Sequence, residues 1–309
     1  MRVVALIPGG VSEQILFFPT LDGIKRNYPE ASIDVVVEPR SKGAYRVCKS
    51  VNEVLAFDFQ DRSSLADWAN LVGNLRDREY EAVITLEQRW VIRLLLWLSG
   101  IPTRVGFINN GNGTGFLTNT VPMKTEQYVA KTYHDLLSAL EIKSEFSELT
   151  VNLPKSDIDW AQETQKRLGV SAGYILIDVE GGYPAQSWKS VIQDILQKQP
   201  GMSVILIKGE GSNDLIRDLI QSIPEIKTTS PEDIGKLAAM IAGANLMLCA
   251  TGLAMHLSVG VQTYTLALFG AEEPAKLLPQ SDKFIAIKSP SEKISAILPE
   301  NVLAKIWGD

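Results

Sequence analysis

The chain has little cysteine and little histidine, with two of each among its 309 residues. Cys48 and Cys249 lie far apart, each among apolar residues. The opening residues do not have the pattern of a signal peptide, and we expect none. We therefore expect two buried thiols in a reducing compartment, and a cytoplasmic protein. His134 and His256 form no close cluster with the cysteines, so the sequence predicts no metal site of the zinc type.

Long apolar runs are also missing, since none approaches the roughly 20 residues needed to span a bilayer. The nearest, Trp90 to Leu98, is short and carries Arg93. We interpret it as a buried or half-buried helix. The alternative is a peripheral association, in which an outward-facing surface with Trp90 and Trp97 contacts the inner face of a membrane.

Basic runs are the third absence. The chain has 30 lysines and arginines against 36 acidic residues, which gives a net charge of -6. A nucleic-acid binder draws its affinity from clustered lysine and arginine, so we expect no nucleic-acid partner. The hydrophobic fraction of 45% and the length are typical of a globular protein with two domains, each with its own core.

What the chain does contain is an alternation of short apolar runs, rich in β-branched residues, with segments of helical spacing. The run Arg2 to Ile7 is typical of a strand buried on both faces. The alternation predicts an α/β fold with parallel, doubly wound sheets. A polar stretch at 143–157 interrupts it and is the best candidate linker. We expect two domains, 1–150 and 151–299, that face each other across a cleft.

Two local patterns add detail to this prediction. Residues 109–120 are rich in asparagine and glycine and are typical of a mobile or ligand-facing loop. Ser230 as an N-cap, followed by Pro231 in the first turn, predicts a helix over 231–241.

The first candidate site follows the opening strand. Pro8, Gly9 and Gly10 end that strand, and Ser12 and Glu13 begin a helix. A glycine turn between strand and helix places backbone N–H groups and one acidic side chain at the carboxyl edge of the sheet, where α/β folds bind ligands. Many such turns only connect elements, and composition alone leaves both interpretations open.

The second candidate site lies in the second half, where three expected strands end in polar or glycine-rich turns. These turns are Glu180-Gly181-Gly182, Lys208-Gly209-Glu210-Gly211 and Ala250-Thr251-Gly252. Several such turns at one sheet edge make a pocket of backbone donors suited to phosphates or sugar hydroxyls. The N-terminus of a helix over 254–260 would point into it, with its partial positive charge near a diphosphate.

Two side chains near these turns have two interpretations each. Lys208 supplies a full positive charge to the pocket or is a solvated lysine at a strand end. His256, in the first turn of the helix over 254–260, contacts a base or sugar or is a buried structural histidine.

Four segments, in this order and spacing, carry a resemblance to a known family: PGGVSEQILFFPTLDGIKRNYP, LSGIPTRVGF, SWKSVIQDIL and DIGKLAAMIAGANLMLCATGLAMHLSVGVQTYTLALFGAEEPAKLLP. Through most of both halves the chain resembles glycosyltransferase family 9, the ADP-heptose:lipopolysaccharide heptosyltransferases, and within it the cyanobacterial members. The resemblance implies a GT-B fold of two Rossmann-like domains, with the nucleotide-sugar donor on the C-terminal domain and the acceptor on the N-terminal one. It also implies no metal, and a final helix, 300–309, that packs back on the N-terminal domain.

Site roles follow from the same resemblance. Glu13 stands where the family has its aspartate, the proposed general base that takes the proton of the acceptor hydroxyl, and Gly10 and Ser12 lie on the acceptor side. The family's lysine two residues before the tryptophan of SWK falls on Gln186, and its donor-binding aspartate falls on Thr251. The residues expected on the donor side are Gly181, Gln186, Lys189, Lys208, Gly209, Thr251, Gly252, Met255 and His256.

Three functional hypotheses remain at this point. The first is a metal-independent inverting glycosyltransferase that moves heptose or another sugar from a nucleotide sugar, ADP-linked or not, to a lipopolysaccharide or other glycan or glycolipid acceptor. The second is a non-catalytic relative with an altered donor site that acts in binding or scaffolding. The third is an unrelated two-domain α/β protein that binds or isomerises sugars.

Overall fold

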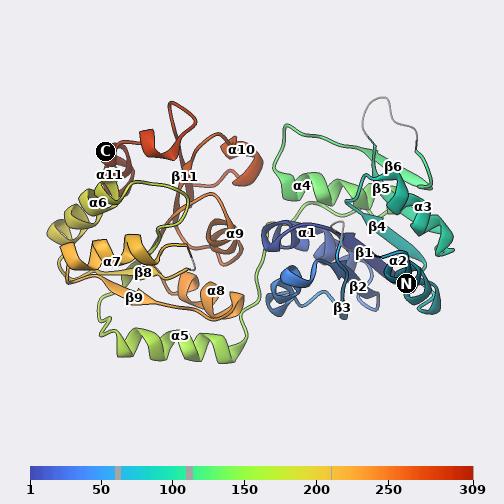
Figure 1. Cartoon of the computed structure of the whole chain (residues 1–309), viewed down its shortest axis with the longest axis horizontal. Coiled ribbons are helices and arrows are strands. Elements are labelled where there is room, and N and C mark those ends of the chain that lie inside the picture. The colour runs from blue at the N-terminus through green and yellow to red at the C-terminus, as the bar shows by residue number, and fades with distance from the viewer. Residues whose placement is uncertain (60–63, 109–113, 210, 309) are drawn as a thin grey trace. The chain divides into compact units, whose positions relative to one another are not determined.

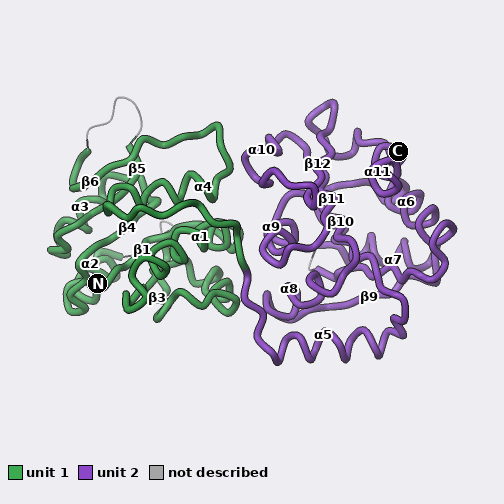
Figure 2. Tube along the Cα trace, turned by 180° about the vertical axis from the view of Figure 1, so that it is seen from behind, with its two compact units in different colours: residues 1–150 green, residues 151–309 purple. Residues whose placement is uncertain are grey.

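The computed structural model describes residues 1–59, 64–108, 114–209 and 211–308. It divides into two compact units, Met1–Thr150 and Val151–Asp309 (Figure 2). Residues 109–113, the first part of the loop expected at 109–120, lie outside the described residues, as does Glu210. In the part that is described, no helix combines the length and the apolar character needed to cross a membrane.

The first unit is built on a six-stranded parallel sheet (Figure 1). Its strands are β1 (Arg2–Ile7), β2 (Ser32–Val37), β3 (Glu53–Ala56), β4 (Ala82–Thr85), β5 (Thr103–Ile108) and β6 (Asn119–Pro122). Its helices are α1 (Val11–Asn27), η1 (Pro39–Val47), α2 (Leu65–Asp77), α3 (Trp90–Leu98), α4 (Val129–His134) and η2 (Asp135–Leu140). The strand order β3-β2-β1-β4-β5-β6 places β1 at the centre, where both of its faces are buried.

The connections of this sheet run in two directions from β1. The α1 crossover leads from β1 to β2 on one side, whereas α2 and α3 lead towards β4 and β5 on the other. Because parallel crossovers are right-handed, helices that run in opposite directions cover opposite faces. One core cluster accordingly joins Val4 and Leu6 of β1 to Leu75 of α2 and Leu96 of α3.

The second unit repeats this architecture with the order β12-β11-β10-β7-β8-β9. Its strands are β7 (Tyr174–Asp178), β8 (Ser203–Ile207), β9 (Lys227–Thr229), β10 (Leu246–Ala250), β11 (Thr265–Phe269) and β12 (Phe284–Lys288). Its helices are α5 (Lys155–Arg167), α6 (Ala185–Lys198), α7 (Asn213–Ser222), α8 (Ile234–Ala242), α9 (Leu253–Gly260), α10 (Pro274–Leu277), η3 (Ile294–Ala296) and α11 (Pro299–Trp307). The predicted α/β class, with two parallel Rossmann-like sheets, is confirmed.

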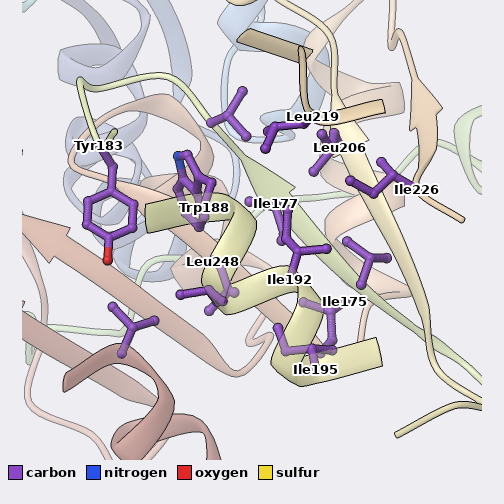
Figure 3. Packing of buried hydrophobic residues seen from close by; sticks show 14 of the residues in the cluster. Ile175, Ile177, Tyr183, Trp188, Ile192, Ile195, Leu206, Leu219, Ile226 and Leu248 are labelled. Atoms are coloured by element: carbon purple, nitrogen blue, oxygen red, sulfur yellow. The ribbon is translucent and has the colours of Figure 1, made fainter. Parts of the chain in front are cut away.

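The core of the second unit is organised around Trp188 of α6. Its side chain is 1% exposed, and its ring packs edge-on against Tyr183 with the centroids 4.9 Å apart. Figure 3 shows these two rings beside the isoleucines and leucines of β7, β8 and α6. The cluster fixes the start of α6, and with it the turn that follows β7.

The final helix, α11, packs on α6 and against β11 and β12 of its own unit. Its expected contact with the N-terminal domain stays a prediction. Val302, Leu303 and Ile306 join the core cluster of that unit. The Trp307 indole N–H also donates a hydrogen bond to Asp194 of α6 at 2.8 Å. The apolar stripe of this helix is therefore buried within the second unit.

The start of α8 differs from the prediction. Ser230 and Pro231 do not begin it. The helix starts at Ile234, and Asp233 is the N-cap, whose carboxylate accepts a hydrogen bond from the Lys236 N–H at 3.0 Å. Ser230 and Pro231 lie in the connection before the helix. Asp233 caps the helix instead, because aspartate is as good an N-cap residue as serine.

Candidate functional site

The turn between β1 and α1 holds the Glu13 carboxylate close to the backbone. Gly9 has a φ of +114°, a conformation that L side chains rarely adopt. The Gly10 N–H, at the N-cap, donates a hydrogen bond to Glu13 Oε2 at 2.9 Å. A Cβ on Gly9 would lie 3.1 Å from Glu13 Cγ. The two glycines therefore leave room for the half-buried carboxylate to fold back over the turn.

Buried polar side chains fix this turn. Gln14 is fully buried, and its Nε2 donates to the Ile7 carbonyl at 3.0 Å, while its Oε1 accepts from the Tyr45 hydroxyl at 2.8 Å. The Ser41 hydroxyl donates to the Gly9 carbonyl at 2.7 Å. The sequence analysis did not identify these residues. The signal available for Gln14 was a polar residue just before a run of four apolar ones.

Tyr133 of α4 is a further neighbour that the sequence analysis missed. Burial, and then the negative charge of Glu13, raise the pKa of this tyrosine to about 12, so it is a neutral hydroxyl near neutral pH. Its ring lies 5.9 Å from that of Phe17 in α1. The Glu13 carboxylate thus has a backbone donor on one oxygen and a neutral tyrosine nearby, and the N-terminus of α1 favours a negative charge there. This arrangement suits a group that accepts a proton.

In the second unit, the turns after β7 and β10 lie against each other. Gly181 and Gly182 have φ values of +102° and +85°. A Cβ on Gly181 would overlap the Cβ of Ala250, the last residue of β10. Thr251 and Gly252 follow Ala250 directly and begin α9. The structure therefore brings the predicted residues Gly181, Thr251 and Gly252 to one edge of the sheet.

The turn after β8 lies next to the turn after β7, and the acidic side chain of Glu180 connects the two. A Cβ on Gly209 would overlap Oε1 of Glu180, so the Glu180 carboxylate lies over the Gly209 backbone. Asp178, at the end of β7, accepts a hydrogen bond from the Glu180 N–H at 3.1 Å, and burial raises the pKa of its carboxyl. Sequence analysis did not single out Asp178. Two carboxyl groups therefore stand at the edge expected to receive a diphosphate.

The two lysines expected near this edge are exposed or half-buried rather than buried. Lys208 is exposed at the end of β8, and Lys189 is half-buried on α6. Gln186 is exposed in the first turn of α6, and its side chain carries no charge. Among the residues that the structure describes, no group of three or more histidine, cysteine, aspartate or glutamate side chains is arranged to hold a metal ion.

Met255 and His256 are part of the interior. Met255 is fully buried and His256 is 3% exposed. Burial lowers the pKa of His256 to about 4, so the ring is neutral near neutral pH. Its Nδ1 is buried and makes no hydrogen bond to the residues that the structure describes. Of the two interpretations of this histidine, the geometry favours the buried one, with an unsatisfied nitrogen beneath the start of α9.

Buried His256 should make the stability of the protein depend on pH. An unperturbed histidine titrates near 6.5, whereas the folded ring resists protonation until about pH 4. The unfolded chain therefore binds the proton first as the pH falls, and the free energy of unfolding should drop by about 3 kcal/mol between roughly pH 7 and pH 4. Denaturant unfolding across this range, compared between wild type and His256→Asn, measures the difference. Parallel profiles of the two proteins would contradict the assignment.

Comparisons with known proteins address the family and the fold of the chain. The model of glycosyltransferase family 9 (heptosyltransferase) matches residues 68–304. Lipopolysaccharide heptosyltransferase 3 of Escherichia coli is 22% identical over 293 residues, covering 88% of this chain and 84% of that protein. Photosynthetic NDH subunit of subcomplex B 1, chloroplastic, of Arabidopsis thaliana is 21% identical over 308 residues, covering 89% of this chain and 66% of that protein.

Solved structures give the same fold. The glycosyl transferase family 9 structure from Veillonella parvula aligns with a TM-score of 0.85 at 17% identity, covering 99% of this chain and 96% of that one. E. coli heptosyltransferase WaaC with ADP aligns with a TM-score of 0.79 at 15% identity, covering 100% and 99%. The GT-B fold expected from the sequence is confirmed, while the role of each site residue stays a prediction.

Proposed function

Because the chain belongs to glycosyltransferase family 9, we propose that it transfers a sugar, heptose or another, from a nucleotide sugar to a lipopolysaccharide or other surface-glycan acceptor in the cytoplasm. The transfer inverts the anomeric carbon and needs no metal. Relatives named as heptosyltransferases support the reaction class, and the similarity to a structure with bound ADP makes an ADP-linked sugar the first donor to test. Membership in the family leaves no support for an unrelated sugar-binding or sugar-isomerising protein.

The observation that carries this proposal is the Glu13 carboxylate at the end of β1, with one oxygen held by the Gly10 N–H. In the proposed reaction, Glu13 accepts the proton of the acceptor hydroxyl while the hydroxyl oxygen attacks the anomeric carbon. The bond from that carbon to the diphosphate breaks, and the nucleoside diphosphate leaves with the bonding electrons. Gly10 and Ser12 lie beside Glu13 on the acceptor side.

On the donor side, we assign the diphosphate to the turns after β7, β8 and β10. The backbone N–H groups at the start of α9, after Gly252, and the Thr251 hydroxyl are donors for phosphate oxygens. Lys208 and Lys189 supply positive charge. The carboxyl groups of Asp178 and Glu180 work against the positive charge of these lysines. This edge therefore selects a donor whose sugar or nucleotide offers hydroxyl groups to the two carboxyl groups.

A second candidate function is supported by specific observations. Gln186 and Thr251 stand where the resemblance expects a lysine and an aspartate, and a relative at 21% identity is named as a subunit of a larger assembly. These features favour a non-catalytic protein that keeps the fold for binding or scaffolding. The first candidate requires the donor edge to bind a nucleotide sugar and the chain to transfer that sugar, whereas the second requires neither.

A thermal-shift panel separates the two candidates. Sugars linked to ADP, UDP and GDP are added at about 1 mM, and a donor at 100 times its dissociation constant stabilises the fold by about 2.7 kcal/mol, which raises the melting temperature by several degrees. We expect one donor class to give this shift, and Lys208→Gln to reduce it, because the exposed lysine contributes charge rather than packing. No shift with any donor would favour the second candidate.

A further inference from the structure

Helix α3 exposes its apolar side chains and buries its charge. Trp90 is 68% exposed and Trp97 is 51% exposed, and Val91 and Leu98 are each 43% exposed. Arg93, the one charged residue of the helix, is 7% exposed and donates a hydrogen bond to the Phe107 carbonyl at 2.8 Å. A helix on a water-facing surface has the opposite arrangement.

The exposed residues form one continuous stripe. Trp90 and Trp97 are seven positions apart, as are Val91 and Leu98, so each pair lies on one side of the helix. The stripe is about 13 Å long at 1.5 Å per residue. The ring of Phe116 extends it, with its centroid 5.8 Å from that of Trp97. Ile92 and Leu96, on the other side of α3, are buried against the sheet.

The sequence from the start of α3 to the end of β6 carries only basic charges, although the chain as a whole is acidic. No aspartate or glutamate occurs from residue 88 to residue 125, and Glu87, just before the helix, has a side chain that is 11% exposed and pairs with Arg89 at 2.7 Å. At the C-terminal end of α3, Arg76 donates a hydrogen bond to the Leu98 carbonyl at 2.7 Å, and Arg104 donates to the Phe116 carbonyl at 2.7 Å. Both guanidinium groups are bound by neutral carbonyl oxygens at these contacts, which leaves their charge to attract anions.

We propose that the outer face of α3 docks on an anionic phospholipid surface. Tryptophan prefers the level of the lipid headgroups, and an apolar helix face flanked by arginine lies in that interface with its side chains among the upper acyl carbons. The arginines at the end of the helix pair with lipid phosphates, each strengthening attachment to a negative leaflet. The proposal does not depend on the donor or acceptor named above.

Vesicle flotation of the full chain tests this proposal. Vesicles of phosphatidylcholine are compared with vesicles that contain about 30 mole per cent phosphatidylglycerol, at about 50 mM and about 500 mM salt. We expect binding to the anionic vesicles, weaker at high salt, and about tenfold or more weaker for Trp90→Ser/Trp97→Ser. Tyr264→Ser removes an aromatic side chain that is 58% exposed on the second unit, and it should bind like wild type.

Brominated lipids provide a second readout, since they quench tryptophans that enter the bilayer. They should quench the wild type more than the double variant, whose melting temperature should stay within a few degrees of wild type because more than half of each side chain is exposed. The proposal is overturned by absent binding, by equal binding to neutral vesicles, or by equal binding of the double variant. It is also overturned if the wild type dimerises through this face and the double variant does not.

Discussion

Replacing Glu13 with glutamine should slow sugar transfer by about 10²- to 10⁴-fold, the contribution expected of a positioned general base. Glutamine has the size of glutamate but cannot take the proton of the acceptor hydroxyl. It can still accept the hydrogen bond from the Gly10 N–H that the carboxylate accepts now. Release of nucleoside diphosphate with saturating donor and acceptor measures the rate, and calorimetry measures the affinity for the donor, which should not change.

Two controls separate catalysis from folding at this position. Glu13→Gln should melt within a few degrees of wild type, because the cap hydrogen bond of α1 is kept and only the favourable negative charge at the helix N-terminus is lost. Glu13→Ala removes the cap as well, and should lose about 1 kcal/mol of stability in addition to activity. A Glu13→Gln variant that keeps its rate, or that loses donor affinity, would contradict the role of Glu13 as the base.

Gly181→Ala should have the second large effect, a loss of about 2–5 kcal/mol in the free energy of unfolding together with a loss of donor affinity. A side chain at φ +102° is strained, and the added methyl would overlap the Cβ of Ala250. Ala250 is 7% exposed and on a central strand, so the turn after β7 must move away from β10. Denaturant unfolding and calorimetric titration of the donor measure the two effects.

Gly209→Ala is the matched control. The added methyl would also meet a close neighbour, but that neighbour is the carboxylate end of Glu180, an exposed residue that can turn aside. We expect a stability change within about 1 kcal/mol of wild type for this variant. Equal losses in both variants would mean that the β7 and β10 turns are not the rigid part of the donor edge.

The features of this structure that depend on a local residue pattern, namely its strands, helices and glycine turns, were predictable from sequence. The alternation of apolar runs and helical spacing predicted the parallel sheets, because each run carries its own period. The glycine turns around Glu13 and Gly181 were also predictable, because glycine marks the positions that need a positive φ.

The parts that depend on distant contacts were not predictable. The anchoring of the β1–α1 turn by Gln14 requires Tyr45, which lies 31 residues away. The place of α11 is decided by the apolar surface of α6 and by Asp194, neither of which is visible from the helix itself. Asp178 ends an apolar strand, and the sequence alone does not show that burial in the folded unit raises the pKa of its carboxyl.

The most direct test of the proposed function is an NMR measurement of what happens to the donor selected by the thermal-shift panel. The donor is incubated with the protein in the presence of a chelator, and NMR identifies the products. A metal-independent inverting transferase should release nucleoside diphosphate, with glycan acceptor or slowly with water, and the new sugar bond should have the opposite anomeric configuration. A donor that binds and stays intact with every acceptor would contradict the account, and would instead favour a family member that binds without catalysing transfer.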